Sequence, residues 1–233
     1  MMLTLKTLST GSSGNCYLLS TENETLILDC GIPIKDIKKG LDYNITKIVG
    51  VAVSHSHQDH SKCVEAFKRM GIMVFTPYLH KNLCDYRRCY LGKFMITTFE
   101  LPHNETPNYG FLIEADDQKI LYMTDFEYCK YRFANMKVDH ILIECNYQTE
   151  LVNRDLPNYE HKIKGHCSLE TCKNFIEVNA TNNLKTVLLL HMGGETCEPE
   201  ECVNEIKKVA KNAYVDYARK GLEIELRKDL CPF

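Results

Sequence analysis

The sequence predicts an α/β fold that is rich in short strands and contained in one domain, residues 1–233. Runs of β-branched and aromatic residues recur at intervals typical of successive strands, and a few segments between them have helical periodicity. No internal repeat and no linker rich in Pro, Gly or Ser divides the chain. Strand-rich domains often reach this length as a single unit.

The N-terminal part contains closely spaced strand signals. Segment 5–31 predicts two or three short strands, with residues 11–15 forming the first turn. Segment 48–54 predicts another strand, which runs into a histidine-rich loop. Residues 61–70 then have helical periodicity, with Ser61 as the N-cap and Gly71 as the stop signal.

The remaining elements alternate between strands and two longer helices. The predicted helices begin at Ser168 and Pro199, and cover 168–179 and 199–213. The strand-like runs are 72–77, 94–101, 109–115, 119–125, 140–145, 185–191 and 222–228.

Composition excludes several classes of protein. With 44% hydrophobic residues the chain can bury a sizeable core, so disorder is not indicated. The N-terminus lacks a basic start and an unbroken apolar core, and no apolar run approaches the ~18 residues of a membrane span. We therefore expect a cytoplasmic location and no membrane partner. The formal charge of −3 argues against a coat of positive charge for non-specific nucleic-acid binding, although a local basic groove is compatible with it.

The chain has 12 cysteines without a close-spaced framework. We expect most of them to be reduced, buried and small apolar groups. Three pairs have four intervening residues: Cys84 and Cys89, Cys167 and Cys172, and Cys197 and Cys202. Structural zinc usually uses tighter pairs, so this spacing is a weak signal.

The segment "SHSHQDH" places four metal-capable side chains, His55, His57, Asp59 and His60, directly after an apolar run. Residues two apart in an extended chain point the same way, so His55, His57 and Asp59 can converge while His60 turns away. One loop can thus supply two metal ions. Imidazole and carboxylate without cysteine favour a catalytic site over a closed structural one, whereas the alternative is a solvated loop.

Three further polar residues follow predicted strands: His103, Asp125 and His191. Strand ends are rigid platforms, and these side chains can project onto the same sheet edge as the histidine loop. Taken singly, Asp125 can be a helix N-cap, and His103 or His191 can be a structural histidine that binds no metal. Their joint placement favours a metal site.

These motifs resemble the metallo-β-lactamase superfamily over nearly the whole chain. The matching segments occur in its order: "GSSGNCYLL", "LILDCG", "HSHQDH", "LPHNETPNYGFLI", "YMTD", "ILIECN", "GHCSLE" and "LLLHMG". The "GSSGN" turn at 11–15 and "GHCS" at 165–168 are most similar to the YycJ-type exonucleases. The resemblance implies an αββα sandwich of two mixed β-sheets with helices on the outside.

The resemblance also implies site roles. One divalent metal ion would be bound by His55, His57 and His103, and a second by Asp59, His60 and His191, with Asp125 bridging. Zn²⁺ or Mn²⁺ is expected, with iron as a further option. Catalytic roles fall to Asp59 and to His166, which would lie near the scissile phosphate, the alternative being a structural histidine. Asp29 would brace the histidine loop or serve only as a turn carboxylate.

The implied function is hydrolysis of a phosphodiester in DNA or RNA by a metal-bridged hydroxide. One alternative is hydrolysis of a thioester, a carboxyl ester or a lactone at the same metal site, since the fold alone does not determine the substrate. Another is a binding protein that has this fold but has lost enzymatic activity. The side chains suited to holding a nucleic-acid strand are Arg87, Arg88, Lys93, Lys162, Lys164, Tyr86 and Tyr90. The alternative is that these residues only form a solvated charged face. Departures from the family pattern, such as Asn104 after His103, lie on loops around the site and bear on substrate choice. The sequence makes no prediction of oligomeric state.

Overall fold

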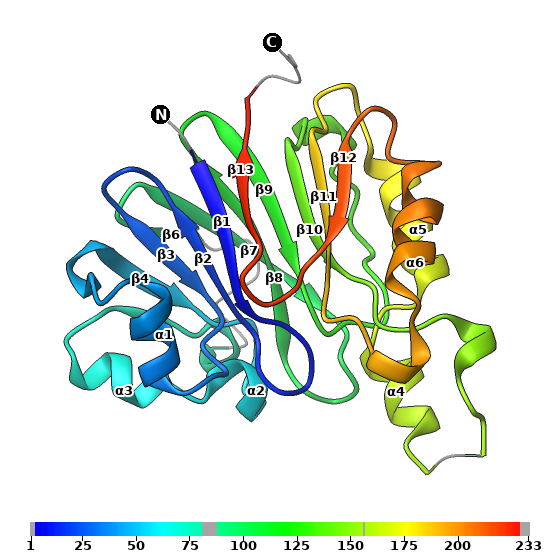
Figure 1. Cartoon of the computed structure of the whole chain (residues 1–233), viewed down its shortest axis with the longest axis horizontal. Coiled ribbons are helices and arrows are strands. Elements are labelled where there is room, and N and C mark those ends of the chain that lie inside the picture. Colours follow the sequence, from blue (N-terminus) through cyan, green and yellow to red (C-terminus); the bar gives the residue numbers. More distant parts are fainter. Residues whose placement is uncertain (1–2, 81–87, 156, 229–233) are drawn as a thin grey trace.

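Two mixed β-sheets pack face to face in the computed structural model, which describes residues 3–80, 88–155 and 157–228 (Figure 1). The six-stranded sheet has the order β13 (Glu223–Leu226), β1 (Leu3–Ser9), β2 (Cys16–Ser20), β3 (Thr25–Leu28), β4 (Ile48–Ala52), β5 (Val74–Phe75). The seven-stranded sheet has the order β12 (Tyr214–Tyr217), β11 (Thr186–Leu190), β10 (His140–Glu144), β9 (Gln118–Met123), β8 (Asn108–Ala115), β7 (Phe94–Leu101), β6 (Arg88–Leu91).

Helices cover the outer faces of both sheets (Figure 1). α1 (Ile34–Gly40) and α3 (Val64–Arg69) lie against the six-stranded sheet, with the short α2 (Gln58–Ser61) at its lower edge. α5 (Leu169–Asn179) and α6 (Pro199–Lys207) cover the seven-stranded sheet, with α4 (Tyr159–Gly165) below them. The expected αββα sandwich is confirmed.

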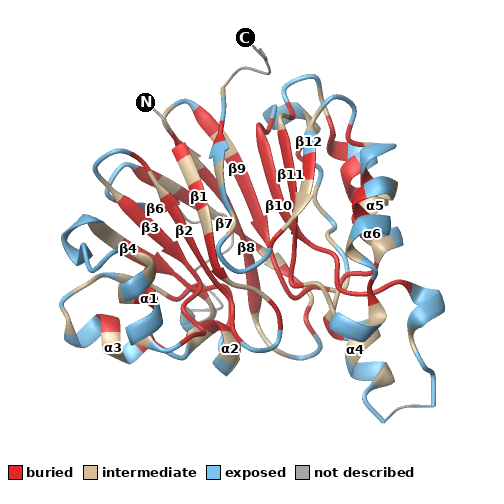
Figure 2. Ribbon diagram, viewed as in Figure 1, coloured by how far each residue is buried: buried red, intermediate tan, exposed pale blue. Residues whose placement is uncertain are grey.

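Alternation along the strands produces three hydrophobic layers. Leu19 and Leu26 face the opposite sheet, whereas their neighbours Leu18 and Ile27 face α1 and α3, because successive side chains of a strand point to opposite faces. A third layer lies between the seven-stranded sheet and α5 and α6. The sheets are therefore buried on both sides, while the outer faces of the helices are exposed (Figure 2).

Strand direction places the candidate ligands at one edge. β3, β4 and β5 are parallel to one another, and so are β9, β10, β11 and β12. β7 and β9 are each antiparallel to β8, so they run in the same direction. The C-terminal ends of these strands, and the polar residues that follow them, meet at the lower edge of the sandwich in Figure 1.

α5 shows how the predicted signals act. Ser168 is its N-cap, and the side-chain hydroxyl accepts a hydrogen bond from the backbone N–H of Thr171. The buried residues Cys172, Phe175 and Ile176 have helical spacing and pack on the sheet. The predicted helix over 168–179 is thus confirmed.

Other expectations were wrong in detail. Ser61 is not the N-cap of one helix over 61–70, because it lies inside α2, where its hydroxyl donates to the backbone oxygens of Ser56 and His57. The helix predicted over 199–213 ends at Lys207, and β12 follows. β6, α1 and α4 were not predicted; each of the two helices has one buried residue and therefore no apolar stripe. None of the helices in the described ranges is long and apolar enough to span a bilayer.

Candidate metal centre

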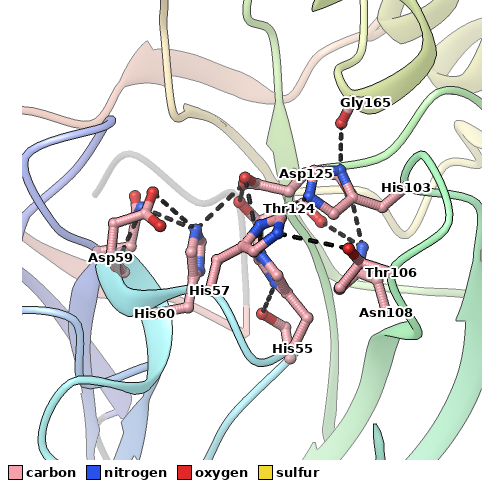
Figure 3. Close-up of polar contacts among 12 residues, drawn as sticks. His55, His57, Asp59, His60, His103, Thr106, Asn108, Thr124, Asp125 and Gly165 are labelled. Carbon is pink, nitrogen blue, oxygen red and sulfur yellow. Dashed lines mark hydrogen bonds and ion pairs between the residues drawn. The ribbon is translucent and has the colours of Figure 1, made fainter. Parts of the chain in front are cut away.

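Loops at the lower edge of the sandwich bring together all seven predicted ligands. Figure 3 labels six of them, all except His191. His55 and His57 follow β4, and Asp59 and His60 lie in α2. The other three, His103, Asp125 and His191, follow β7, β9 and β11. Asp125 is followed by bends and not by a helix, so the N-cap alternative is wrong.

The first cluster consists of His55, His57 and His103. The Nδ1 atom of His57 lies 3.1 Å from Nε2 of His55 and 3.1 Å from Nε2 of His103. The second cluster consists of Asp59, His60, Asp125 and His191, and its ligand atoms also lie within 4.8 Å of one another. These are the two sets that the family resemblance implies. The extended-chain argument, which grouped Asp59 with His55 and His57, was wrong because α2 begins at Gln58 and ends the two-residue periodicity.

Asp125 faces both clusters with different oxygens. Its Oδ1 lies 3.3 Å from Nε2 of His60, and its Oδ2 lies 3.9 Å from Nε2 of His55. The side chain is buried, and Oδ1 also accepts from the hydroxyl of Thr124 at 2.7 Å. One carboxylate is therefore positioned between two groups of imidazoles.

Hydrogen bonds orient the imidazoles. Four of the five clustered histidines place Nδ1 against an oxygen; when such a ring is neutral with its proton on Nδ1, the Nε2 lone pair is directed inward. The acceptors are Ser54 Oγ for His55 (3.0 Å), Asp29 Oδ2 for His60 (2.7 Å), Gly165 O for His103 (2.6 Å) and Glu144 Oε1 for His191 (2.9 Å). His57 alone presents Nδ1, while its Nε2 lies 3.4 Å from Thr106 Oγ1.

Asp29 braces the histidine loop, the first of the two roles weighed for it. This fully buried carboxylate accepts from the backbone N–H of Ser54 at 2.8 Å, from Nδ1 of His60 and from the hydroxyl of Tyr122 at 2.6 Å. It thereby ties β3, the histidine loop and the opposite sheet together.

The "GSSGN" and "LDCG" motifs hold α2 in place. The backbone N–H of Asn15 donates to the carbonyl of Asp59, and that of Cys30 donates to the carbonyl of His60, both at 2.7 Å. A Cβ atom at Gly31 would lie 1.6 Å from the carbonyl oxygen of Asp59, so only glycine allows this approach. Asn15, for which no role was predicted, also places Nδ2 2.9 Å from Nε2 of His60.

Glu144 is a site residue that the sequence analysis missed. Its Oε1 accepts from Nδ1 of His166 at 2.7 Å and from Nδ1 of His191 at 2.9 Å. Its Oε2 accepts from the backbone N–H groups of Phe126 and Cys167, both at 3.0 Å. The available signal was an acidic residue at the end of the otherwise apolar run "HILIE", which is fully buried in the structure.

His166 lies at the rim of the second cluster. Its side chain is 16% exposed, compared with 2% for His191, and its Nδ1 lies 4.0 Å from Oδ2 of Asp125. Because Glu144 accepts from Nδ1, the nitrogen left for a substrate is Nε2.

Charge differs between the two clusters. Burial lowers the pKa values of His55, His57 and His103, so these rings are neutral, the form that binds metal. Burial also opposes protonation of His191, but Asp125 and Glu144 outweigh it and raise its pKa to about 10. The carboxylates around the second cluster therefore favour a positive charge on His191.

The residues fit a pair of divalent metal ions. Nε2 of His191 is buried and has no hydrogen-bond partner among the described residues. The imidazole nitrogens of the first cluster approach to 3.1 Å with lone pairs converging, close to the ~3.4 Å separation of nitrogens around tetrahedral zinc. Such a donor set of nitrogen and carboxylate oxygen suits Zn²⁺ or Mn²⁺.

The residues predicted to hold a nucleic-acid strand lie in four places along the chain. Lys162 and Lys164 lie on α4 beside His166, and Lys162 Nζ donates to Asn146 Oδ1 at 2.7 Å. Lys93 precedes β7 at the end opposite His103, roughly 26 Å away along eight residues. Arg88 and Tyr90 pair with Thr97 and Met95 of β7, away from the strand end. Tyr86 and Arg87 lie outside the described residues.

Comparisons with known proteins identify the fold. A family model described as the metallo-beta-lactamase superfamily matches residues 9–73. The metallo-beta-lactamase fold protein YhfI from Bacillus subtilis superposes with a TM-score of 0.74 at 18% identity, covering 97% of this chain and 100% of that one. The chain thus has the metallo-β-lactamase fold, and its resemblance to that superfamily is confirmed.

Two curated relatives are similar over most of their length. The chain is 24% identical to the exodeoxyribonuclease WalJ of Streptococcus pneumoniae over 240 residues, which covers 90% of this chain and 86% of the relative. It is 22% identical to the exodeoxyribonuclease YycJ of Bacillus anthracis over 221 residues, covering 82% and 83%. The resemblance to the YycJ-type branch is therefore confirmed as well.

Proposed function

We propose that this protein is a metal-dependent phosphodiesterase that degrades nucleic-acid strands in the manner of an exonuclease. The observation that carries the proposal is the position of Asp125, whose two oxygens face separate clusters of imidazoles. His55, His57 and His103 would hold one divalent ion, and Asp59, His60 and His191 the other, with Asp125 shared. When bound, two such ions supply a nucleophile at neutral pH and offset the negative charge of a phosphodiester.

The chain's own groups would then position the substrate and move a proton. His166, held through Nδ1 by Glu144, would contact the phosphate or donate a proton from Nε2 to the leaving oxygen. Asp59, whose side chain is 27% exposed, is more open to a substrate than Asp125 at 3%. Asp29, Glu144 and Ser54 would keep the ligand nitrogens oriented.

Several observations support a nucleic-acid substrate. Both curated relatives described above are named exodeoxyribonucleases. Lys162 and Lys164 lie four and two residues before His166, where they can contact phosphates that flank the scissile bond. The formal charge of −3 means that such contacts would be few, so binding should weaken with salt along a shallow slope.

The test is cleavage of end-labelled single-stranded DNA and RNA with added Mn²⁺, run beside a thioester and a lactone. We expect chelator-sensitive loss of nucleotides from a strand, and loss of that activity in Asp59→Ala. Asp155→Ala, a change at an exposed acidic residue, is the matched control. Rapid turnover of the thioester or the lactone, with both nucleic acids inert, would assign the function to the rival hydrolase class.

A further inference from the structure

Four cysteines gather behind the candidate metal centre, in the hydrophobic layer between the seven-stranded sheet and its helices. They come from four segments: Cys145 follows β10, Cys172 lies in α5, Cys197 follows a short 3-10 turn, and Cys202 lies in α6. All four are buried, with exposures between 0% and 4%. They include both members of the pair Cys197 and Cys202 but only one member of the pair Cys167 and Cys172, a relation that sequence spacing alone does not reveal.

Three of the four sulfur atoms are close enough to share one ion. Those of Cys145, Cys197 and Cys202 lie within 4.8 Å of one another, and the sulfurs of Cys197 and Cys202 are 3.1 Å apart. Cys172 lies beside this group, where its thiol interacts with that of Cys145. For comparison, sulfur atoms around tetrahedral zinc are separated by about 3.8 Å, given Zn–S bonds of about 2.3 Å.

Without a metal ion, the cluster consists of neutral thiols. The hydrogen bond with Cys145, aided by burial, raises the pKa of Cys197 to about 12. Thiolates would need a compensating positive charge, since the surroundings are apolar. Two features lower the cost of burying thiolates here. Cys172 and Cys202 are each the fourth residue of a helix, near its positive end. The Lys162 ammonium also interacts electrostatically with Cys197.

We propose that Cys145, Cys172, Cys197 and Cys202 form a structural thiolate site for one Zn²⁺-class ion, separate from the imidazole and carboxylate centre. Thiolates are soft ligands that select this class of metal. Binding would replace one proton on each coordinating sulfur, so that four thiols and M²⁺ give a four-coordinate thiolate complex and four protons. The ion would cross-link the end of β10 to α5 and α6, directly behind Glu144.

The probe is Co²⁺, added to full-length protein that has been stripped of metal and kept reduced. Thiolate ligands give cobalt a near-ultraviolet charge-transfer absorption that imidazole and carboxylate ligands do not give. We expect this band to saturate at one cobalt ion per chain. The total number of metal ions bound per chain should be one more than the number held by the imidazole and carboxylate centre. Cys202→Ser and Cys145→Ser should weaken binding at the thiolate site at least 10-fold.

Cys16→Ser is the matched control, because Cys16 is equally buried but lies in the layer beside α1 and α3. It should leave the band unchanged. Reduced wild-type protein without the band would overturn the proposal, even if the variants do not fold. So would an unchanged band in folded Cys202→Ser, or isolation of the native protein with a Cys197–Cys202 disulfide.

Discussion

Replacing Glu144 with glutamine tests whether buried hydrogen bonds set the metal-binding form of the histidines. The carboxylate accepts four hydrogen bonds, two at each oxygen, from Nδ1 of His166, Nδ1 of His191, and two backbone N–H groups. A glutamine has one oxygen and one NH₂ group. If the oxygen stays with the backbone donors, the NH₂ group faces Nδ1 of both histidines and each must present a lone pair there.

The consequence for His191 follows from its two nitrogens. A lone pair at Nδ1 places the proton of a neutral ring at Nε2, and that nitrogen can then no longer bind a metal ion. Loss of such an orienting partner typically lowers metal affinity 10- to 100-fold, or about 1.4 to 2.7 kcal/mol. We therefore expect Glu144→Gln to lose affinity at one of the two sites of the candidate centre, with the other site less affected.

The assay is competition for Zn²⁺ against a chromophoric chelator, with circular dichroism as the check on folding. Glu177→Gln, an equivalent change at an exposed position of α5, is the matched control and should bind as wild type does. If folded Glu144→Gln holds both ions with unchanged affinity, then the carboxylate does not control the histidine tautomer and the reasoning is refuted.

Three more predictions separate binding, stability and pH response. Asp125→Ala should impair binding of both ions in metal analysis, whereas His166→Ala should keep its metal and turn over slowly; equal metal loss would make His166 a ligand. Ser168→Ala should lower the free energy of unfolding by about 1 kcal/mol in urea, because the N–H of Thr171 loses its cap, and an unchanged midpoint would contradict this. Burial lowers the pKa of His140 to about 4, so the unfolded chain alone takes up a proton between pH 6.5 and 4. Wild type should thus lose about 2 kcal/mol more stability than His140→Gln between pH 7 and pH 5, and parallel pH profiles would count against it.

The strand-end positions of the ligands were predictable from sequence because an apolar run followed by a polar residue marks the end of a buried strand. His103, Asp125 and His191 all satisfied that pattern, and parallel strand directions bring such ends to one edge. The division of the histidine loop between two clusters was not predictable from spacing, since the helix that begins at Gln58 changes the periodicity. That division came only from the family resemblance.

Residues that act through hydrogen bonds were harder to predict. Glu144 ends a run that reads as an ordinary buried strand, and Asn15 belongs to a turn in which asparagine is common for conformational reasons. Their roles depend on partners 22 to 47 residues away in the sequence, which no local pattern encodes. The four-thiol cluster has the same property, because its members come from four separate segments.

The backbone at the candidate centre has a consequence for protein engineering. Asp125 and His191 have φ values of 52° and 47°, in the left-handed region that favours glycine, and each follows a buried strand. Lys137 and Lys211 share this conformation, with φ values of 52° and 56°, but Lys137 follows a short 3-10 helix and Lys211 lies in a turn, both away from the centre. A variant library selected only for folded, abundant protein should enrich glycine at all four positions, since that relieves about 1 kcal/mol of strain at each. A library selected for turnover should accept glycine at the two lysines and retain Asp125 and His191, so the difference between the two selections would map the catalytic edge without a substrate-bound structure.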